Sequence, residues 1–234
     1  MRVNRLSGFT RTLSTRVSRR LALGGAAAGA LAGTTRTVAQ YGGSETPVGV
    51  GEPGANAFEF VGVIQQAGLD FRLAGYVTTL AGVDSALLFD GADPLGRDET
   101  TARLALVGSA AGVARSILQN LFVVNAEGTV QFVLIEPGAS FENPESFSNG
   151  TAVVTLPVAL QDVINVQAPQ TGIAIGFGVL EIDTTEPFQL NGESLAIGEP
   201  GLRYRVTLTG QGQLHNPETL EATILVAGNG VVAR

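Results

Sequence analysis

The chain has 234 residues, with 14 basic residues against 21 acidic ones, a single histidine and no cysteine. This composition excludes thiolate catalysis, cysteine-ligated zinc and histidine-rich metal sites. The acidic balance argues against a nucleic-acid partner, because binding to phosphates needs basic side chains, and no motif indicates a cofactor.

Charge is distributed unevenly along the chain. All the basic residues are arginines, and seven of them lie in residues 1–39, where no acidic residue occurs. Removal of that segment leaves seven arginines against 21 carboxylates, which is a net charge of −14. A segment of such different composition is predicted not to belong to the folded domain.

Residues 1–39 have the layout of an export signal: a basic start, a weakly apolar run over 21–32, and small residues before a cleavage point. The run has about 12 residues, whereas a bilayer span needs roughly 20. Five positions carry the pattern: Ser18, Arg19, Arg20, Leu23 and Ala39.

This pattern resembles a twin-arginine export signal. Ala22 and Gly24 depart from it, since the usual signal has phenylalanine and lysine there. The resemblance implies export by the twin-arginine machinery, removal of residues 1–39 by signal peptidase, and a mature protein without a membrane span. The resemblance therefore predicts that the mature protein is extracellular, periplasmic or on the cell surface. A basic, disordered N-terminal tail is the alternative interpretation.

The rest of the chain predicts a flexible linker followed by one domain of β-strands. Residues 40–56 contain much glycine, proline and serine, which predicts the linker. Over 57–234, apolar and polar residues alternate with period two, so one set faces a core. The clearest strands are predicted at 58–65, 71–78 and 202–209, and further ones at 102–111, 116–124, 129–136, 151–167, 171–183, 188–197 and 220–227.

Turn residues separate these segments. Asn191-Gly192 is a strong two-residue hairpin signal, and residues 125–128, which end in glycine, predict a second hairpin loop. Pro157 lies inside a predicted strand and indicates a bulge or an edge position. The loop over 84–98 has room for one helical turn.

The predicted fold is all-β: an antiparallel β-barrel of about 8–10 strands, with a β-sandwich as the alternative. Glycines inside the strand patterns favour the barrel, because a glycine in a strand marks tight curvature or close approach. Residues 49–54 spell G-x-G-x-x-G, but the motif lies in the linker and contains a proline, so it does not indicate nucleotide binding.

Few residues have a pattern typical of catalysis. His215 lies in a predicted hairpin without a nucleophile motif, and we interpret it as a solvated loop residue. The acidic segment 84–99 has the oxygen atoms that calcium needs, but its spacing matches no EF-hand, which favours a solvated loop. Four strand arginines either face solvent, which we favour, or reach a ligand carboxylate inside a barrel: Arg72, Arg103, Arg203 and Arg205.

Three glycine-containing patterns resemble the allene oxide cyclase and dirigent families. They are Gly75-Tyr76 in an early strand, Asn149-Gly150-Thr151, and the glycine-punctuated segment 171–178. The resemblance implies an eight-stranded antiparallel barrel with an apolar cavity. The catalytic carboxylates of those families match no position in this chain, so the resemblance implies a fold and no catalytic residue.

The predicted function is that of an exported barrel, without redox or metal chemistry, that binds a small apolar or amphipathic ligand. Two alternatives stay open: a cyclase, isomerase or hydrolase that uses carboxylates inside the barrel, and a structural or surface-interaction protein with a packed interior. The apolar residues of the best alternating strands are predicted to line the cavity: Phe60, Phe71, Leu73, Leu104, Leu106, Phe132, Leu134, Tyr204, Val206 and Leu208.

Overall fold

A computed structural model of the protein describes residues 45–91 and 93–233. Strands make up 68% of it and short 3-10 helices 6%. In this part of the chain, no helix has the length and apolar character that crossing a membrane demands. The export-signal positions Ser18, Arg19, Arg20, Leu23 and Ala39 lie outside the described residues.

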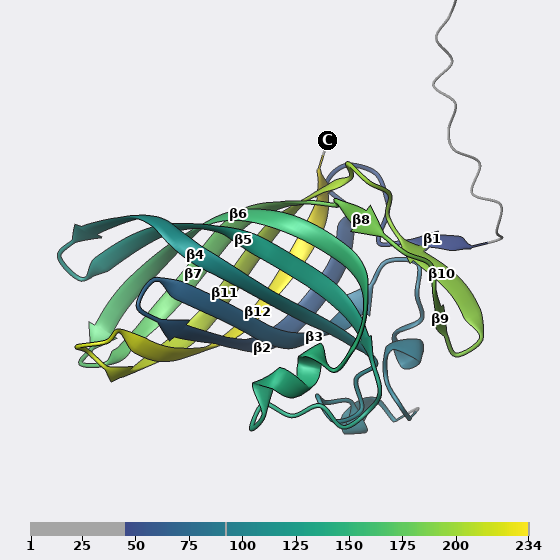
Figure 1. Cartoon of the computed structure of the whole chain (residues 1–234), viewed down its shortest axis with the longest axis horizontal. Helices are drawn as coiled ribbons and strands as arrows, with labels where there is room; N and C mark the ends of the chain where they lie inside the picture. The colour runs from purple at the N-terminus through teal and green to yellow at the C-terminus, as the bar shows by residue number, and fades with distance from the viewer. Residues whose placement is uncertain (1–44, 92, 234) are drawn as a thin grey trace, which may run out of the picture. The chain divides into compact units, whose positions relative to one another are not determined.

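Eight antiparallel strands form a closed barrel. Each strand pairs with both of its neighbours in the order β2-β3-β4-β5-β6-β7-β11-β12, and β12 pairs with β2 to close the ring. The strands run obliquely to the long axis (Figure 1). The prediction of an all-β antiparallel barrel is therefore confirmed. The strands are β2 Asn56–Ala67, β3 Asp70–Leu80, β4 Leu104–Leu118, β5 Leu121–Ile135, β6 Gly150–Ala168, β7 Thr171–Glu181, β11 Arg203–Asn216 and β12 Glu221–Ala233.

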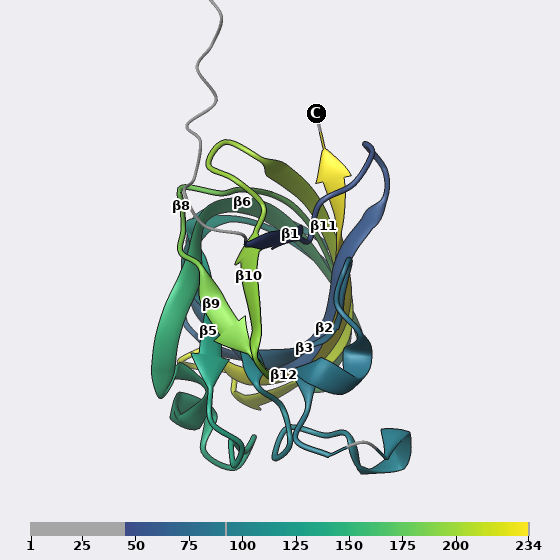
Figure 2. The ribbon, with the colours of Figure 1, turned by 90° about the vertical axis from the view of Figure 1, so that its right-hand side faces the viewer.

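A small sheet caps one end of the barrel. It has the strand order β1 (Thr46–Val48), β10 (Glu193–Ile197) and β9 (Phe188–Leu190), and it lies across the barrel end (Figure 1, Figure 2). Val48 and Ile197 are each 0% exposed and belong to the same apolar core as the barrel strands. The short strand β8 (Thr184–Thr185) pairs with β6 beside this cap.

The capped half of the barrel is packed with aromatic side chains. The ring of Phe58 meets Phe132 edge-on at 5.1 Å and Tyr204 edge-on at 5.4 Å between centroids. Such edge-to-face pairs add about 0.5–1.5 kcal/mol each to the effect of burial. The Tyr204 hydroxyl donates a hydrogen bond of 3.0 Å to the carbonyl oxygen of Gly49, which ties the cap to the barrel core.

The described part of the predicted linker, 45–56, differs from the expectation. β1 pairs in parallel with β10 over Thr46–Val48, and Gly49 accepts the Tyr204 hydrogen bond. A three-residue strand is too short to show an alternating pattern, so the composition of the segment alone suggested flexibility.

At the opposite end of the barrel, the described part of the chain forms four tight hairpins and no covering sheet (Figure 1). They join β2 to β3, β4 to β5, β6 to β7 and β11 to β12. Gln119, at the tip of the β4–β5 hairpin, has a positive φ of 55°. The hairpin predicted at 125–128 is wrong, because β5 runs through it. Gly128 serves packing instead, since a Cβ there would lie 2.8 Å from the Cβ of Ala110 on β4.

Two other local predictions concern Asn191-Gly192 and Pro157. Asn191 and Gly192 form the β9–β10 turn with φ of 50° and 87°, so that hairpin is confirmed. Pro157 lies between two segments of β6 that pair with different strands. The pairing with β7 reaches Val158, and the pairing with β8 begins at Thr155. On this side β6 is locally an edge, where a missing backbone N–H leaves no partner unsatisfied.

Two long connections pack on the outer face of β3 and β4. They contain the 3-10 helices η1 (Ser85–Leu88), η2 (Pro94–Gly96) and η3 (Pro144–Ser148). The ring of Tyr76, which points outward from β3, lies 6.0 Å from Phe89 and 6.1 Å from Phe141. The covered face explains why apolar residues occur on both sides of β3.

Interior glycines provide space for aromatic rings, and this gives a stability prediction. A Cβ at Gly228 would lie 2.7 Å from the Phe60 ring and 2.7 Å from the carbonyl oxygen of Thr207. We expect Gly228→Ala to lower the free energy of unfolding by about 1–3 kcal/mol, as overpacking does. Urea denaturation measures it.

Gly212→Ala is the matched control. It also faces the barrel interior, but its nearest neighbour is the Ile224 side chain at 3.3 Å, which has room to shift toward the open end. Equal losses in the two variants would show that strand glycines serve backbone curvature and not ring packing.

Candidate functional site

Three ionisable side chains face the interior from the eight barrel strands: Arg115, Asp162 and Tyr204. Their direction follows from the strand register. Arg115 pairs with Val124, and Val124 pairs with Asp162. Arg115, Val124 and Asp162 therefore lie in one row on the same face of β4, β5 and β6. Val124 is 3% exposed and faces the core, so the row lies on the inner face of the barrel. Asp162 is half-buried, and Arg115, at the open end, is exposed. Charged groups inside an apolar barrel are the natural candidates for function.

A β-bulge brings Arg115 to the inner face. The pairing of β4 with β5 shifts between Gly112 and Ala114, so Val113 is an extra residue on β4. A shift of one residue moves every following side chain to the other face of a strand. Arg115 and Ile117 therefore lie on the inner face of β4, although at the open end both stay exposed to solvent, Ile117 by 59%. Without the bulge, Arg115 would lie on the outer face.

The open end of the barrel contains an apolar pocket of about 160 Å³, which we call the mouth pocket. Its polar side chains include Arg115 and Gln66. Most of the wall is aliphatic or aromatic, and it draws residues from seven of the eight barrel strands. The apolar side chains that matter most here are Phe122, Val124, Ile164, Val166, Leu214 and Ile224.

Arg115 is held at this pocket by an aromatic ring. Its guanidinium carbon lies 5.1 Å from the centroid of the Phe122 ring, a cation–π contact. The ion pairs within residues 45–91 and 93–233 are Arg103–Asp90 and Arg203–Glu181, so Arg115 has no carboxylate partner there. The pocket thus offers a guanidinium that is positioned but not neutralised.

Asp162 lies one inward position deeper than Ile164, beside a second, smaller cavity of about 60 Å³, which we call the inner cavity. The other inward side chains that line it are apolar, among them Ile64, Leu160 and Leu208. One carboxylate oxygen, Oδ1, is buried and has no hydrogen-bond partner among the residues that the structure describes. Burial raises the pKa of Asp162 from 3.8 to about 6, because a desolvated carboxylate is disfavoured.

A small apolar cluster lies between the mouth pocket and the inner cavity. Phe71, Val124 and Ala126 are all buried and pack together. Phe71 lines the inner cavity and Val124 lines the mouth pocket, so the cluster is their common wall. The two spaces therefore follow one another along the barrel, from the open mouth toward the packed core.

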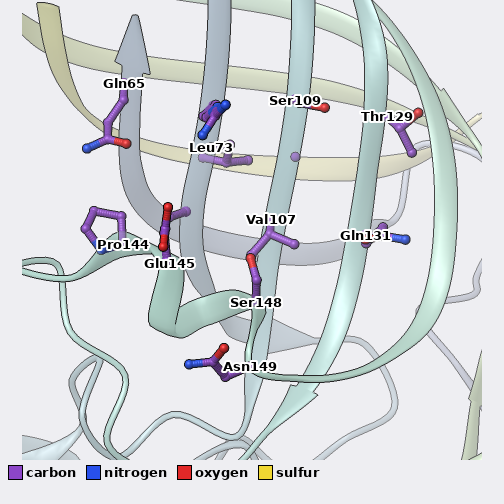
Figure 3. Close-up of a pocket in the computed structure, with 13 residues that line it drawn as sticks. Gln65, Leu73, Val107, Ser109, Thr129, Gln131, Pro144, Glu145, Ser148 and Asn149 are labelled. Carbon is purple, nitrogen blue, oxygen red and sulfur yellow. The ribbon is translucent and has the colours of Figure 1, made fainter.

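The largest hollow, of about 590 Å³, is a groove on the outside of the barrel. Figure 3 shows Glu145 and Ser148 of η3 on one side of it, and Gln65 and Thr129 of the strands on the other. Arg72 is the one basic residue in its wall. The groove is polar and open to solvent, and it contains no buried ionisable group. By volume alone this groove would be the candidate site, but the ionisable side chains on the inner face make the barrel interior the better candidate.

The ten residues predicted to line a cavity all share the inward face by register, but they divide into two groups. Phe71, Leu73 and Leu208 line the inner cavity. The others belong to or pack against the core of the barrel interior: Phe60, Leu104, Leu106, Phe132, Leu134, Tyr204 and Val206. Their role around a ligand stays a prediction, and the mouth pocket uses a different set of residues.

The four strand arginines proposed as alternatives face outward. Arg72, Arg203 and Arg205 are exposed, and Arg203 pairs with Glu181 at 2.7 Å. Arg103 pairs with Asp90 at 3.0 Å. The solvent-facing interpretation is confirmed for Arg72, Arg203 and Arg205. The Arg103 side chain is half-buried, 28% exposed, on the outside of the barrel.

The acidic segment 84–99 uses its carboxylates locally. Asp84 and Asp93 accept hydrogen bonds from the backbone at the starts of η1 and η2, and Asp98 accepts from Thr100, which lowers the pKa of Asp98. In the described ranges, no group of three or more potential ligand residues is placed to hold a metal ion.

His215 is exposed and its Nε2 lies 2.9 Å from the hydroxyl of Thr223.

The outer face of β7 carries exposed apolar side chains. Ile173, Ile175, Phe177 and Val179 alternate along it and are 37–51% exposed. Inward residues of the same strand are mostly glycine and alanine. This inverted pattern is the observation that bears most directly on a surface-interaction role.

Comparisons of the chain with protein-family models, curated proteins and solved structures give no match. The eight strands of the barrel equal the number that the allene oxide cyclase and dirigent resemblance implies, but membership of those families stays a prediction. The residues of the barrel interior are therefore the basis for a proposed function.

Asp162 gives a prediction about stability and pH. With a pKa of about 6 in the folded protein and 3.8 as the ordinary value, the folded state binds more protons than the unfolded chain in this range. The free energy of unfolding therefore falls as pH rises from about 4 to 6. Above about pH 6 the cost of ionising the buried carboxyl group has reached its full value. We expect Asp162→Asn to be more stable than wild type at pH 7 by roughly 2–3 kcal/mol, with the difference vanishing near pH 4.

Urea denaturation at pH 4, 5.5 and 7 measures this difference. Asp183→Asn, at an exposed position, is the control and should follow the wild-type pH profile. If Asp162→Asn does the same, the carboxyl group of Asp162 is solvated and the inner cavity has no electrostatic significance.

Proposed function

We propose that the protein binds a small amphipathic carboxylic acid in the mouth pocket. The observation that carries this proposal is the unneutralised guanidinium of Arg115, held on the Phe122 ring at the rim of an apolar pocket. The carboxylate would pair with Arg115, and the hydrocarbon chain would lie against the aliphatic wall. Arginine keeps its charge at any physiological pH and pairs with carboxylates through two parallel hydrogen bonds.

The size of the pocket limits the ligand to a short chain. Each buried CH₂ contributes about 0.8 kcal/mol, so five methylenes contribute about 4 kcal/mol, and a charge-assisted hydrogen bond adds about 1.5–3 kcal/mol. The loss of free motion on association opposes these gains. A dissociation constant in the micromolar to millimolar range is the reasonable expectation.

The charge of the rest of the protein restricts the ligand further. Beyond residue 39 the chain has seven arginines and 21 carboxylates, so its surface potential is negative and repels multiply charged anions. A monoanion with a short apolar chain is repelled least and still gains from contact with the apolar wall of the pocket. This favours a monocarboxylic acid over a phosphorylated metabolite.

Binding of octanoate tests the proposal. We expect the wild-type protein to bind octanoate with measurable heat, and Arg115→Gln to weaken binding about tenfold or more because the charge-assisted pair is lost. Isothermal titration calorimetry measures both.

Arg72→Gln is the matched control, since Arg72 is exposed on the outer face of β3, in the wall of the outer groove. It should bind octanoate as wild type does. Loss of binding in Arg72→Gln with retention in Arg115→Gln would assign the ligand to the outer groove and contradict the proposal.

Asp162 favours a second candidate function, acid–base catalysis inside the barrel. An isolated acid with a raised pKa beside a cavity is a frequent feature of proton-transfer sites. Among the inward residues of the described barrel strands, the other ionisable groups are Arg115 at the mouth and Tyr204 in the packed half. Catalysis would therefore depend on one carboxyl group without a nearby partner, and binding is the function that we put forward.

We also propose that the protein is exported, with Arg19 and Arg20 as the export signal and cleavage after Ala39. The paired arginines precede a weakly apolar run and small residues, as the resemblance to twin-arginine signals requires. Replacement of both arginines with lysine should retain the precursor inside the cell, as cell fractionation would show. Unchanged export of the double variant would contradict the signal assignment.

A further inference from the structure

We propose that Asp162 forms a second, deeper subsite that binds a hydrogen-bond-donating group, a hydroxyl or a protonated amine, at the far end of the same ligand. The ligand class is then a short apolar carboxylic acid with a hydroxyl or amino group at the end opposite the carboxylate. This inference rests on the proposed function, because the ligand enters through the mouth pocket.

The position of Asp162 relative to Arg115 supports a subsite for one and the same ligand. Both residues flank Val124 in one row, on β6 and β4. Neighbouring strands lie about 4.8 Å apart, so the two backbones are about 10 Å from one another. Arg115 extends toward Phe122 at the mouth, whereas Asp162 lies beside the inner cavity. One short molecule is long enough to meet both groups.

The Asp162 carboxylate also has an acceptor oxygen without a hydrogen-bond donor in the described residues. An ionised carboxylate only accepts hydrogen bonds, and Oδ1 has no donor. The inward residues around it on β2, β3, β5 and β11 are apolar: Ile64, Phe71, Leu73, Val124, Val130 and Leu208. Buried polar groups are nearly always paired in proteins, so a donor from outside residues 45–91 and 93–233 would complete this site.

The charged and titratable groups of the neighbouring strands do not supply that donor. Arg115 on β4 is directed to the mouth pocket, and the Tyr204 hydroxyl on β11 donates to Gly49 in the capped half. β7 contributes Gly176, where a Cβ would contact Oδ1 of Asp162 and lie 2.8 Å from Cγ of Leu208. Glycine at this position therefore keeps space for the carboxylate in the interior.

Water is the competing occupant of the inner cavity. About 60 Å³ holds one or two water molecules, and these would satisfy Oδ1 without any ligand. A ligand donor gains affinity by replacing such water only if it reproduces the hydrogen bond. The ligand chain must also displace the partition formed by Phe71 and Val124.

The experiment compares three ω-hydroxy acids and three ω-amino acids of six, eight and ten carbons with the unsubstituted acids of the same length. Calorimetry at pH 7 measures binding to wild type, Asp162→Leu, Asp162→Asn and Arg115→Gln. We expect at least one hydroxy or amino acid to bind wild type about tenfold more tightly than its parent acid, as a hydrogen bond to a charged group allows. In Asp162→Leu this gain should disappear, while binding of the parent acid persists.

A proton measurement separates direct contact from a merely structural role of Asp162. A donor that binds the carboxylate lowers its pKa, so binding at pH 5.5 should release up to one proton in wild type. Titration in two buffers of different ionisation enthalpy counts that proton. Asp162→Asn, which keeps the size of the side chain, should release none.

The outcomes separate the two proposals. If octanoate and the other parent acids do not bind, the proposed function itself fails. If they bind and Arg115→Gln weakens them, but no hydroxy or amino acid gains affinity, water alone occupies the inner cavity and the Asp162 subsite is wrong. A gain that persists in Asp162→Leu likewise overturns the subsite.

Discussion

The pairing of β12 with β2 is the constraint on which the rest of the structure depends. It joins the first and last strands of the barrel through ten residue pairs, so the sheet has no free edge between them. Closure turns the two faces of one sheet into an inside and an outside. Every side chain on the inner face then shares one enclosed space, and a single polar group there is separated from bulk water.

Within this space the two halves of the barrel have different contents because the two ends are closed differently. The cap and the aromatic rings of Phe58, Phe132 and Tyr204 fill one half. Hairpins without a cover leave the other half open, with Arg115 at its rim and Asp162 at its depth. The barrel is thus neither a filled core nor a through-channel, and the binding that we propose uses its open half.

The sequence predicted the architecture better than the site. The period-two pattern identified Phe60, Leu104 and Phe132 as inward residues because every second residue beside them on the strand is apolar or glycine. Arg115 escaped prediction because the Val113 bulge reverses the alternation, and because β4 was divided into two strands at that point. Asp162 follows Gln161, and two consecutive polar residues reveal nothing about which one faces inward. The strand register decided both.

The hydrogen bond between Tyr204 and Gly49 links positions 155 residues apart, and this has a consequence for the order of folding. Neither the cap nor the aromatic half can form until β10 and β11 are available, near the end of the chain. Contacts of such long range are slow to form, because the entropy of closing a large loop must be overcome first. Until then, strands such as β2 and β7 have unpaired edges and exposed apolar faces. The period before closure is therefore when the chain is most exposed to misassembly with other chains.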